Sequence, residues 1–369
     1  MAMMRGFSQR LALAAALSLC VVPVKAETYQ HEEIRIAMPE AGARGLEALL
    51  VRPDHPGRYP LVLLSHVAPR KAEDRQKMSP WGQYPLALEF ARRGWAAAIV
   101  MRRGYGDSGG PYAENRRSCQ DVDYLEAARA SVRDLKAAIN WLIKRPDIDG
   151  SRMVAVGQSA GGLATVALTG DAPPGLVAAI SFAGGRGSIR DFEICREDRL
   201  IAAFRTFGKT SRIPMLWVYA ENDHFFAPPL AEKMRNAFVE AGGNVEFIHA
   251  PAFGKDGHRL FSLTGISKWT PYVDAFFAKN KLTLRASPMA LPPLPALAPP
   301  PQLSANGRQT FELYLRGGQH KAFAVASDGH FGWQTGKRTV EEARNTALKF
   351  CRDGAKDCRV VFVDDAAAP

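Results

Sequence analysis

Six continuous apolar runs in the first 250 residues constrain the fold of this 369-residue chain more than any other feature. Strands with one exposed face alternate apolar and polar residues, whereas strands buried on both faces, as in parallel sheets, are apolar throughout. The runs therefore predict an α/β fold with a doubly wound, mostly parallel sheet. They are PLVLLS (60–65), WAAAIVM (95–101), RMVAVG (152–157), LVAAISF (176–182), IPMLWVYA (213–220) and NVEFIHA (244–250).

The segments between these runs are long enough for helices. One helix is expected from Tyr124 to Ile143, because its apolar residues recur every three or four positions and form one stripe. Pro146 then ends it, since proline cannot continue a helix. The stripe consists of Leu125, Ala128, Val132, Leu135, Ile139 and Leu142.

A proline-rich stretch divides the chain. Residues 287–302 read SPMALPPLPALAPPPQ, with seven prolines and no charge, which predicts an extended spacer. We therefore expect a large α/β domain over 27–285, a linker over 286–305 and a small α+β module over 306–369.

Within the module, the runs FELYLR (311–316) and KAFAVAS (321–327) are compatible with a hairpin around Gly317 and Gly318. Thr339, followed by Glu342 three residues later, is typical of a capping box and predicts a helix to about Cys351. RVVFVD (359–364) is then expected to return as a strand.

Residues 1–26 are typical of a cleavable secretory signal. Arg5 and Arg10 precede an apolar stretch of about half the length that a membrane span needs, and Val24-Lys25-Ala26 ends it. The signal predicts a periplasmic or secreted protein. Lipidation at Cys20 is the alternative, although the bulky Leu19 before it disfavours such processing.

The chain after residue 26 keeps four cysteines, an even number that suits an oxidising compartment. Sequence spacing favours Cys351 with Cys358, and hence Cys119 with Cys195. Four cysteines allow three pairings, however, and some can stay free.

The formal charge is +11, and it falls to +8 without Arg5, Arg10 and Lys25. No basic stripe interleaved with aromatic residues accompanies this excess, so a nucleic-acid partner is not expected. The sequence leaves the oligomeric state open.

The segment Gly157-Gln158-Ser159-Ala160-Gly161 lies between an apolar run and a stretch of small residues beginning GGLATVAL. A strand, a tight turn and a helix in this order are what a nucleophile elbow requires. The pattern alone is weak in a chain with 32 glycines, so the setting carries the inference. We predict that Ser159 is a nucleophile.

A serine nucleophile needs a base, and the base needs a carboxylate to orient it. Asp223 follows the run PMLWVYA, and His258 lies in the loop FGKDGHRLF, which gives the chain order Ser, Asp, His. Glu221 is the competing carboxylate. His224 and His249 are the weaker candidates for the base.

Together with Asp223 and His258, the runs DIDGSRMVAVGQSAGG (147–162) and RGYGDSGG (103–110) resemble the α/β-hydrolase superfamily, in particular its dienelactone hydrolase-like and prolyl-oligopeptidase-like branch. The resemblance covers about residues 45–280. It implies a Ser-His-Asp triad that cleaves an ester or an amide through an acyl-enzyme. Dienelactone hydrolase itself uses a cysteine where this chain has Ser159, so lactone hydrolysis is not implied. The RGYGDSGG loop is expected to shape a pocket rim without chemistry.

The oxyanion of such a reaction needs two fixed backbone N–H donors. Ala160 is expected to supply one. The segment Ser65-His66-Val67-Ala68 resembles the family's His-Gly-x segment and suggests Ala68 for the other, although Val67 replaces the glycine. No cofactor or metal site is expected, because the histidines lack zinc-site spacing and the triad needs no metal.

These features favour an exported serine hydrolase that acts on small carboxylic esters. The alternatives are an exported peptidase of the prolyl-oligopeptidase-like branch and a non-catalytic envelope-binding protein on the same fold. In each case the C-terminal module is a candidate for contact with envelope or wall material.

Overall fold

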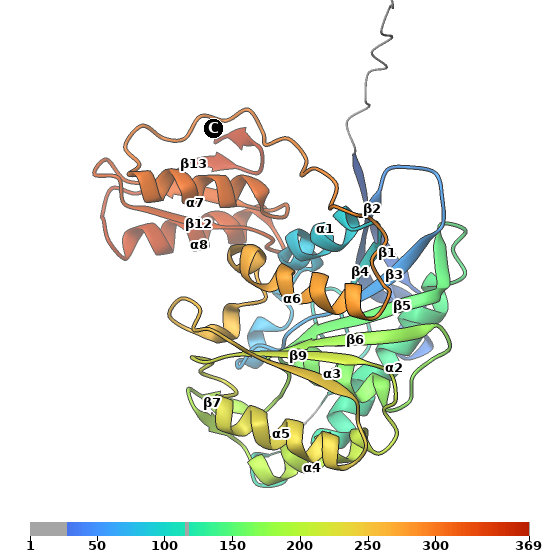
Figure 1. The fold of residues 1–369 in the computed structure, drawn as a ribbon. Coiled ribbons are helices and arrows are strands. Elements are labelled where there is room, and N and C mark those ends of the chain that lie inside the picture. The colour runs from blue at the N-terminus through green and yellow to red at the C-terminus, as the bar shows by residue number, and fades with distance from the viewer. Residues whose placement is uncertain (1–27, 115–117, 369) are drawn as a thin grey trace, which may run out of the picture.

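An eight-stranded sheet forms the centre of the larger domain in the computed structural model, which describes residues 28–114 and 118–368 (Figure 1). The strand order is β1-β2-β4-β3-β5-β6-β9-β10. The pairs β1–β2 and β2–β4 are antiparallel, and all later pairs in this order are parallel. The strands are β1 (Tyr29–Ile36), β2 (Leu46–Pro53), β3 (Tyr59–Ser65), β4 (Ala96–Val100), β5 (Ile148–Gln158), β6 (Leu176–Phe182), β9 (Met215–Ala220) and β10 (Val245–Ala250). The six apolar runs are β3, β4, β5, β6, β9 and β10, so the predicted α/β sheet is confirmed.

Helices cover both faces of this sheet. Alternate strand residues divide between two cores: Leu61 and Leu63 of β3 belong to one, and Val62 and Leu64 to the other. The first core is covered by α2 (Tyr124–Leu142), α3 (Ala160–Thr169), α4 (Glu197–Gly208) and α5 (Pro228–Glu240), and the second by α1 (Tyr84–Arg92) and α6 (Ile266–Lys279). A small hairpin of β7 (Ser188–Arg190) and β8 (Glu193–Ile194) follows β6. In the described part of the chain, every helix is too short or too polar to cross a membrane.

The predicted helix over 124–143 is α2. The Asp123 side chain caps its start by accepting the N–H of Glu126 at 2.9 Å, and the helix ends at Leu142, just before Pro146. Most of the expected apolar stripe is buried, with Leu125 only partly covered.

The prediction for the start of the C-terminal module is wrong. Residues 280–304 contain no helix or strand, and FELYLR then forms the end of helix α7 (Ala305–Arg316) rather than a strand. Ser304 caps this helix through the N–H of Gly307, and Phe311, Tyr314 and Leu315 are buried at helical spacing. β11 (Ala322–Val325) instead pairs antiparallel with β12 (Phe331–Gln334).

The rest of the module follows the prediction. Thr339 caps α8 (Val340–Arg352) by accepting the N–H of Glu342, and β13 (Arg359–Val363) returns to pair with β11. The short strand β14 (Ala366–Ala367) completes the sheet. The predicted signal segment, with Cys20, lies outside the described residues.

Both favoured disulfides are present. Cys119 is bonded to Cys195, and Cys351 to Cys358. The first joins the segment before α2 to the segment before α4, and the second ties the end of α8 to the start of β13. In the smaller domain the bridge adds to a core of few residues, which alone stabilises a fold only marginally.

Removing the two bridges should have unequal effects. The Cys119–Cys195 bridge closes a separation of 76 residues and the Cys351–Cys358 bridge one of 7. The entropy of the unfolded chain then predicts that the free energy of unfolding falls by about 4.5 kcal/mol in the double serine variant of the first pair and by about 2.5 kcal/mol in that of the second. Urea unfolding of the oxidised proteins measures both losses. A larger loss from the second pair would contradict this explanation.

Candidate active site

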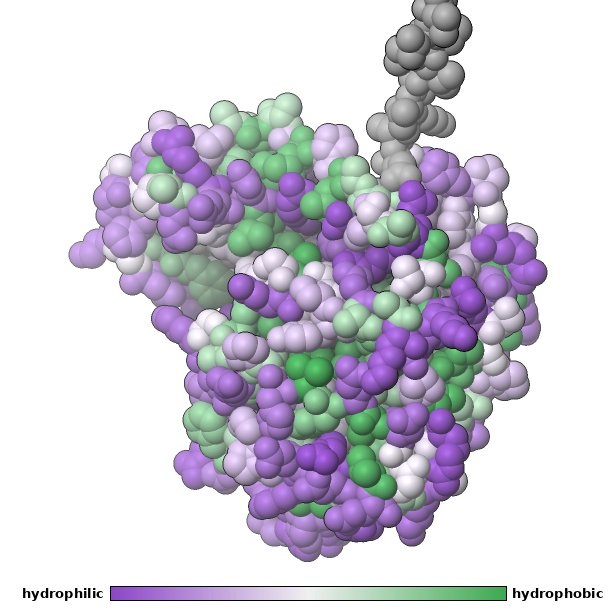
Figure 2. All heavy atoms as spheres, viewed as in Figure 1, coloured by the Kyte–Doolittle hydropathy of each residue, from purple (hydrophilic) through white to green (hydrophobic). Residues whose placement is uncertain are grey.

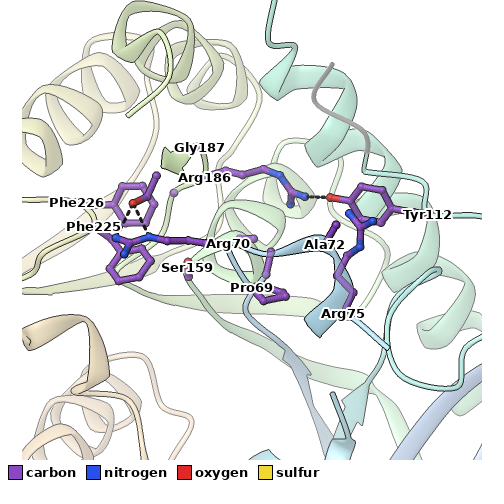
Figure 3. Close-up of a pocket in the computed structure, with 14 residues that line it drawn as sticks. Pro69, Arg70, Ala72, Arg75, Tyr112, Ser159, Arg186, Gly187, Phe225 and Phe226 are labelled. Carbon is purple, nitrogen blue, oxygen red and sulfur yellow. Dashed lines mark hydrogen bonds between the residues drawn. The ribbon is translucent and has the colours of Figure 1, made fainter. Parts of the chain in front are cut away.

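Ser159 lies on the turn between β5 and α3, as predicted, with backbone angles of φ 56° and ψ −121°. A residue other than glycine rarely adopts positive φ, and holding its backbone there costs on the order of 1–3 kcal/mol. The residue is 6% exposed and lines a pocket with Ala160 (Figure 3). The turn therefore presents this serine to the pocket.

Two glycines allow the turn to form. A Cβ atom on Gly157 would lie 2.2 Å from the carbonyl oxygen of Gly161, and one on Gly161 would lie 2.0 Å from that of Ser65. These distances are far inside van der Waals contact with backbone atoms that cannot move aside. The glycines of the motif are thus required by the close approach of α3 to β5 and to the end of β3.

The structure brings Asp223 and His258 together. The Nδ1 atom of His258 lies 3.1 and 3.2 Å from the two carboxylate oxygens of Asp223, which is fully buried. The carboxylate also accepts the N–H groups of Phe225 and Phe226 at 2.7 and 2.9 Å. With Nδ1 donating to this fixed carboxylate, Nε2 is left as the proton acceptor of the neutral ring.

The loop that carries His258 is itself fixed. The Asp256 side chain accepts the N–H of His258 at 2.9 Å, and Gln158 Nε2 donates to the His258 carbonyl at 2.6 Å. Because Gln158 directly precedes Ser159, this bond ties the histidine loop to the serine turn.

The competing residues lie elsewhere. Glu221 is exposed, while Nδ1 of His224 lies 3.1 Å from Asp191 and Nε2 of His249 lies 3.4 Å from Glu232. None of the three contacts the pair formed by Asp223 and His258 through a hydrogen bond or ion pair in the described residues.

The loop after β3 is held by His66. Its Nδ1 lies 2.6 Å from the carbonyl of Val67, and its Nε2 accepts the N–H of Arg102 at 3.0 Å. Burial, followed by the charge of Arg102, lowers the pKa of His66 well below its ordinary value, so the ring is neutral. Nδ1 is then the donor to Val67. Ala68, which follows, lines the same pocket as Ser159 and Ala160, and Val67 does not require the positive φ of a glycine.

The pocket has a volume of about 180 Å³ and contains features that the sequence analysis did not predict. Three arginines, Arg70, Arg75 and Arg186, line it, and Figure 3 shows them on both sides of Ser159. The Phe225 ring stacks on His258 at 4.0 Å, and the Arg70 guanidinium lies 3.9 Å from the centre of the same ring. Since His258 covers one face of Phe225, Arg70 covers the other.

A buried ionic network lies behind the pocket. Glu114 accepts from Arg102, from Arg186 at 2.7 Å and from the Tyr105 hydroxyl at 2.8 Å. Burial would raise the pKa of Glu114, but Arg102 and Arg186 hold it well below its ordinary value. Tyr105 belongs to the RGYGDSGG loop, and a Cβ atom on Gly104 would lie 2.5 Å from Tyr112 Cα. This loop therefore supports the pocket rim.

A second, larger hollow of about 890 Å³ lies between the catalytic domain and the module (Figure 2). Gln158 and His66 line one side, and Phe331, Trp333 and Phe350 of the module line the other. A bidentate ion pair at 2.5 and 2.6 Å between Arg338 of the module and Glu47 of β2 joins the two domains.

One family model matches part of this sequence. The model of the X-Pro dipeptidyl-peptidase (S15 family) matches residues 42–225, which include β2 to β9, Ser159 and Asp223. No curated protein sequence matches the chain. With its strand order, its serine turn and this match, the chain belongs to the α/β-hydrolase superfamily.

Solved structures similar to this one come from several enzymes. A candidate dienelactone hydrolase of Klebsiella pneumoniae is 17% identical, with a TM-score of 0.48 over 68% of this chain and 99% of its own. An esterase of Pyrococcus furiosus is 14% identical, with a TM-score of 0.45 over 69% and 90%. An acylaminoacyl peptidase of Pyrococcus horikoshii is 16% identical, with a TM-score of 0.46 over 70% and 43%.

Replacing Gly161 by alanine should destabilise the protein. The added methyl group would meet the Ser65 carbonyl oxygen at 2.0 Å, and overpacking of this kind costs about 1–3 kcal/mol or more. Gly82→Ala is the matched control, because its Cβ would have an ordinary contact of 3.5 Å. Urea unfolding of both variants tests the explanation, and equal stabilities would contradict it.

Proposed function

We propose that the protein is a serine hydrolase that cleaves carboxylic esters through an acyl-enzyme, with Ser159, His258 and Asp223 as its triad. The observation that carries the proposal is the pair of His258 and buried Asp223, tied through Gln158 to a serine held at positive φ. Ser159 and Phe225 line one pocket, and His258 stacks on Phe225. Hydrogen bonds between a serine and its base are often long before substrate binds.

In this proposal His258 Nε2 takes the proton of the Ser159 hydroxyl as its oxygen attacks the ester carbonyl carbon. The N–H groups of Ala160 and Ala68 stabilise the resulting oxyanion. The C–O bond to the alcohol then breaks, and the alcohol leaves with the proton from His258. Water, activated by the same ring, hydrolyses the acyl-enzyme and regenerates Ser159. Asp223 holds the His258 ring in the tautomer that carries its proton on Nδ1, and it stabilises this ring when it is charged.

A peptidase is the second candidate, because the matching family is that of X-Pro dipeptidyl-peptidases. Amide cleavage would use the same triad and oxyanion donors, so only the substrate separates the two proposals. The third candidate, a binding protein without turnover, would retain the fold but not react at Ser159.

A fluorophosphonate probe should label the folded protein at Ser159, and Ser159→Ala should abolish labelling. Asp223→Asn should lower kcat by about 10⁴-fold, because the ring would be held in the wrong tautomer. Glu221→Gln is the matched control and should stay close to wild type. A folded protein that the probe does not label would support the binding protein. Turnover of peptide anilides well above that of short p-nitrophenyl esters would support the peptidase.

We also infer that the protein works outside the cytoplasm, in the periplasm or after secretion. Two disulfides among the described residues support this location, since such bonds persist in oxidising compartments. We propose that the C-terminal module then contacts envelope or wall material. Its Phe350 side chain is 48% exposed at the hollow between the domains.

Phe350→Ala should weaken binding to isolated cell-wall material, because an exposed aromatic ring contributes contact area with little loss of conformational entropy. Phe192→Ala is the matched control, since Phe192 is 63% exposed on the catalytic domain. Co-sedimentation of the purified full-length proteins measures the effect. Equal binding by wild type and both variants would remove this role.

A further inference from the structure

We propose that the ester cleaved at Ser159 carries a carboxylate on its acyl part, and that Arg75 and Arg186 bind this carboxylate. The inference rests on the proposed ester hydrolysis and specifies its substrate class: monoesters of short dicarboxylic acids.

The charge of the pocket lining is the first observation that favours an anionic substrate. Its lining includes three arginines and no aspartate or glutamate. A neutral acyl chain that displaces water offers these guanidinium groups no acceptor in return, whereas a carboxylate gains charge-assisted hydrogen bonds from them. The lining therefore favours an anion.

The three arginines differ in how far the protein already neutralises them. Arg70 pairs with Asp191 at 3.0 Å and packs on Phe225. Arg75 lies 3.7 Å from the centre of the Tyr112 ring, and its guanidinium forms no ion pair within the described residues. Arg75 is half-buried, so its charge is only partly solvated. It is the arginine most available to a ligand.

Arg186 brings a further positive charge to the same end of the pocket. It is 6% exposed and shares Glu114 with the fully buried Arg102, so that two cations face one carboxylate. Arg186 also donates to the Tyr112 hydroxyl at 2.5 Å. A buried excess charge is costly unless it is compensated, and a bound carboxylate would compensate it.

The position of the general acid indicates which part of the substrate bears the charge. His258 lies against Phe225 and would protonate the leaving alcohol, so the alcohol occupies the Phe225 side. Figure 3 shows Arg75 and Tyr112 at the opposite end, with Ser159 between the two ends. The acyl part therefore extends toward Arg75 and Arg186. The volume of about 180 Å³ is below the roughly 300–1,000 Å³ of sites for drug-sized ligands, which favours a short acyl chain.

The test compares kcat/KM for monoethyl succinate, which is anionic, and diethyl succinate, which is neutral, by acid release. Wild type should prefer the monoester at least about 10-fold, as expected for charge-assisted hydrogen bonds. Arg75→Gln should lower this preference by about 10-fold or more, and Arg205→Gln, a charge-matched change on α4 where Arg205 pairs with Glu240, should leave it unchanged. A third substrate, 3-acetoxypropanoate, carries its carboxylate on the alcohol. Its kcat/KM should be the same for wild type and Arg75→Gln.

The rate of fluorophosphonate labelling at Ser159 separates the two proposals. If wild type and Arg75→Gln are both labelled and succinate slows labelling only in wild type, the carboxylate site is supported. If both are labelled but neither the preference nor the protection depends on Arg75, the inference is overturned and the hydrolase proposal stands. If the folded wild type is not labelled at all, the proposed function fails and the inference fails with it.

Discussion

The contact between the start of α3 and the end of β3 is the constraint on which the rest of the site depends. Gly161 packs so closely on the Ser65 carbonyl that no side chain fits between them. The chain must therefore turn sharply between β5 and α3, and Ser159 takes up the positive φ. The same contact brings Ala160 and Ala68 into the lining of one pocket. The energy that holds this turn comes from the buried strands and helices around it.

Polar networks extend that constraint to the other residues of the site. Gln158 ties the His258 loop to the serine turn, and the carboxylate of Asp223 is fixed by two backbone N–H groups before it meets the ring. On the opposite side, neutral His66 and the Arg102–Glu114 pair fix the loop that carries Ala68. Groups held in this way need little rearrangement when charge develops in a reaction.

Much of the fold could be predicted because its determinants are local in sequence. Strands buried on both faces are continuously apolar, and a cap such as Thr339 marks the start of a helix. β1 could not be predicted in this way, since it is an edge strand with mostly polar, exposed residues. The segment FELYLR is short enough for its apolar residues to fit both a strand and a helix, and the Ser304 cap that starts the helix lies before it. Arg186 lies far from Arg70 and Arg75 in the sequence, so only the fold brings the three arginines to one pocket.

The most direct test of this account is a crystal structure of the protein after reaction with a fluorophosphonate. We expect a bond between phosphorus and Ser159 Oγ, with the phosphonyl oxygen about 3 Å from the backbone nitrogens of Ala68 and Ala160 and His258 still bonded to Asp223. An adduct on another side chain, or a phosphonyl oxygen that points to solvent away from both nitrogens, would contradict it.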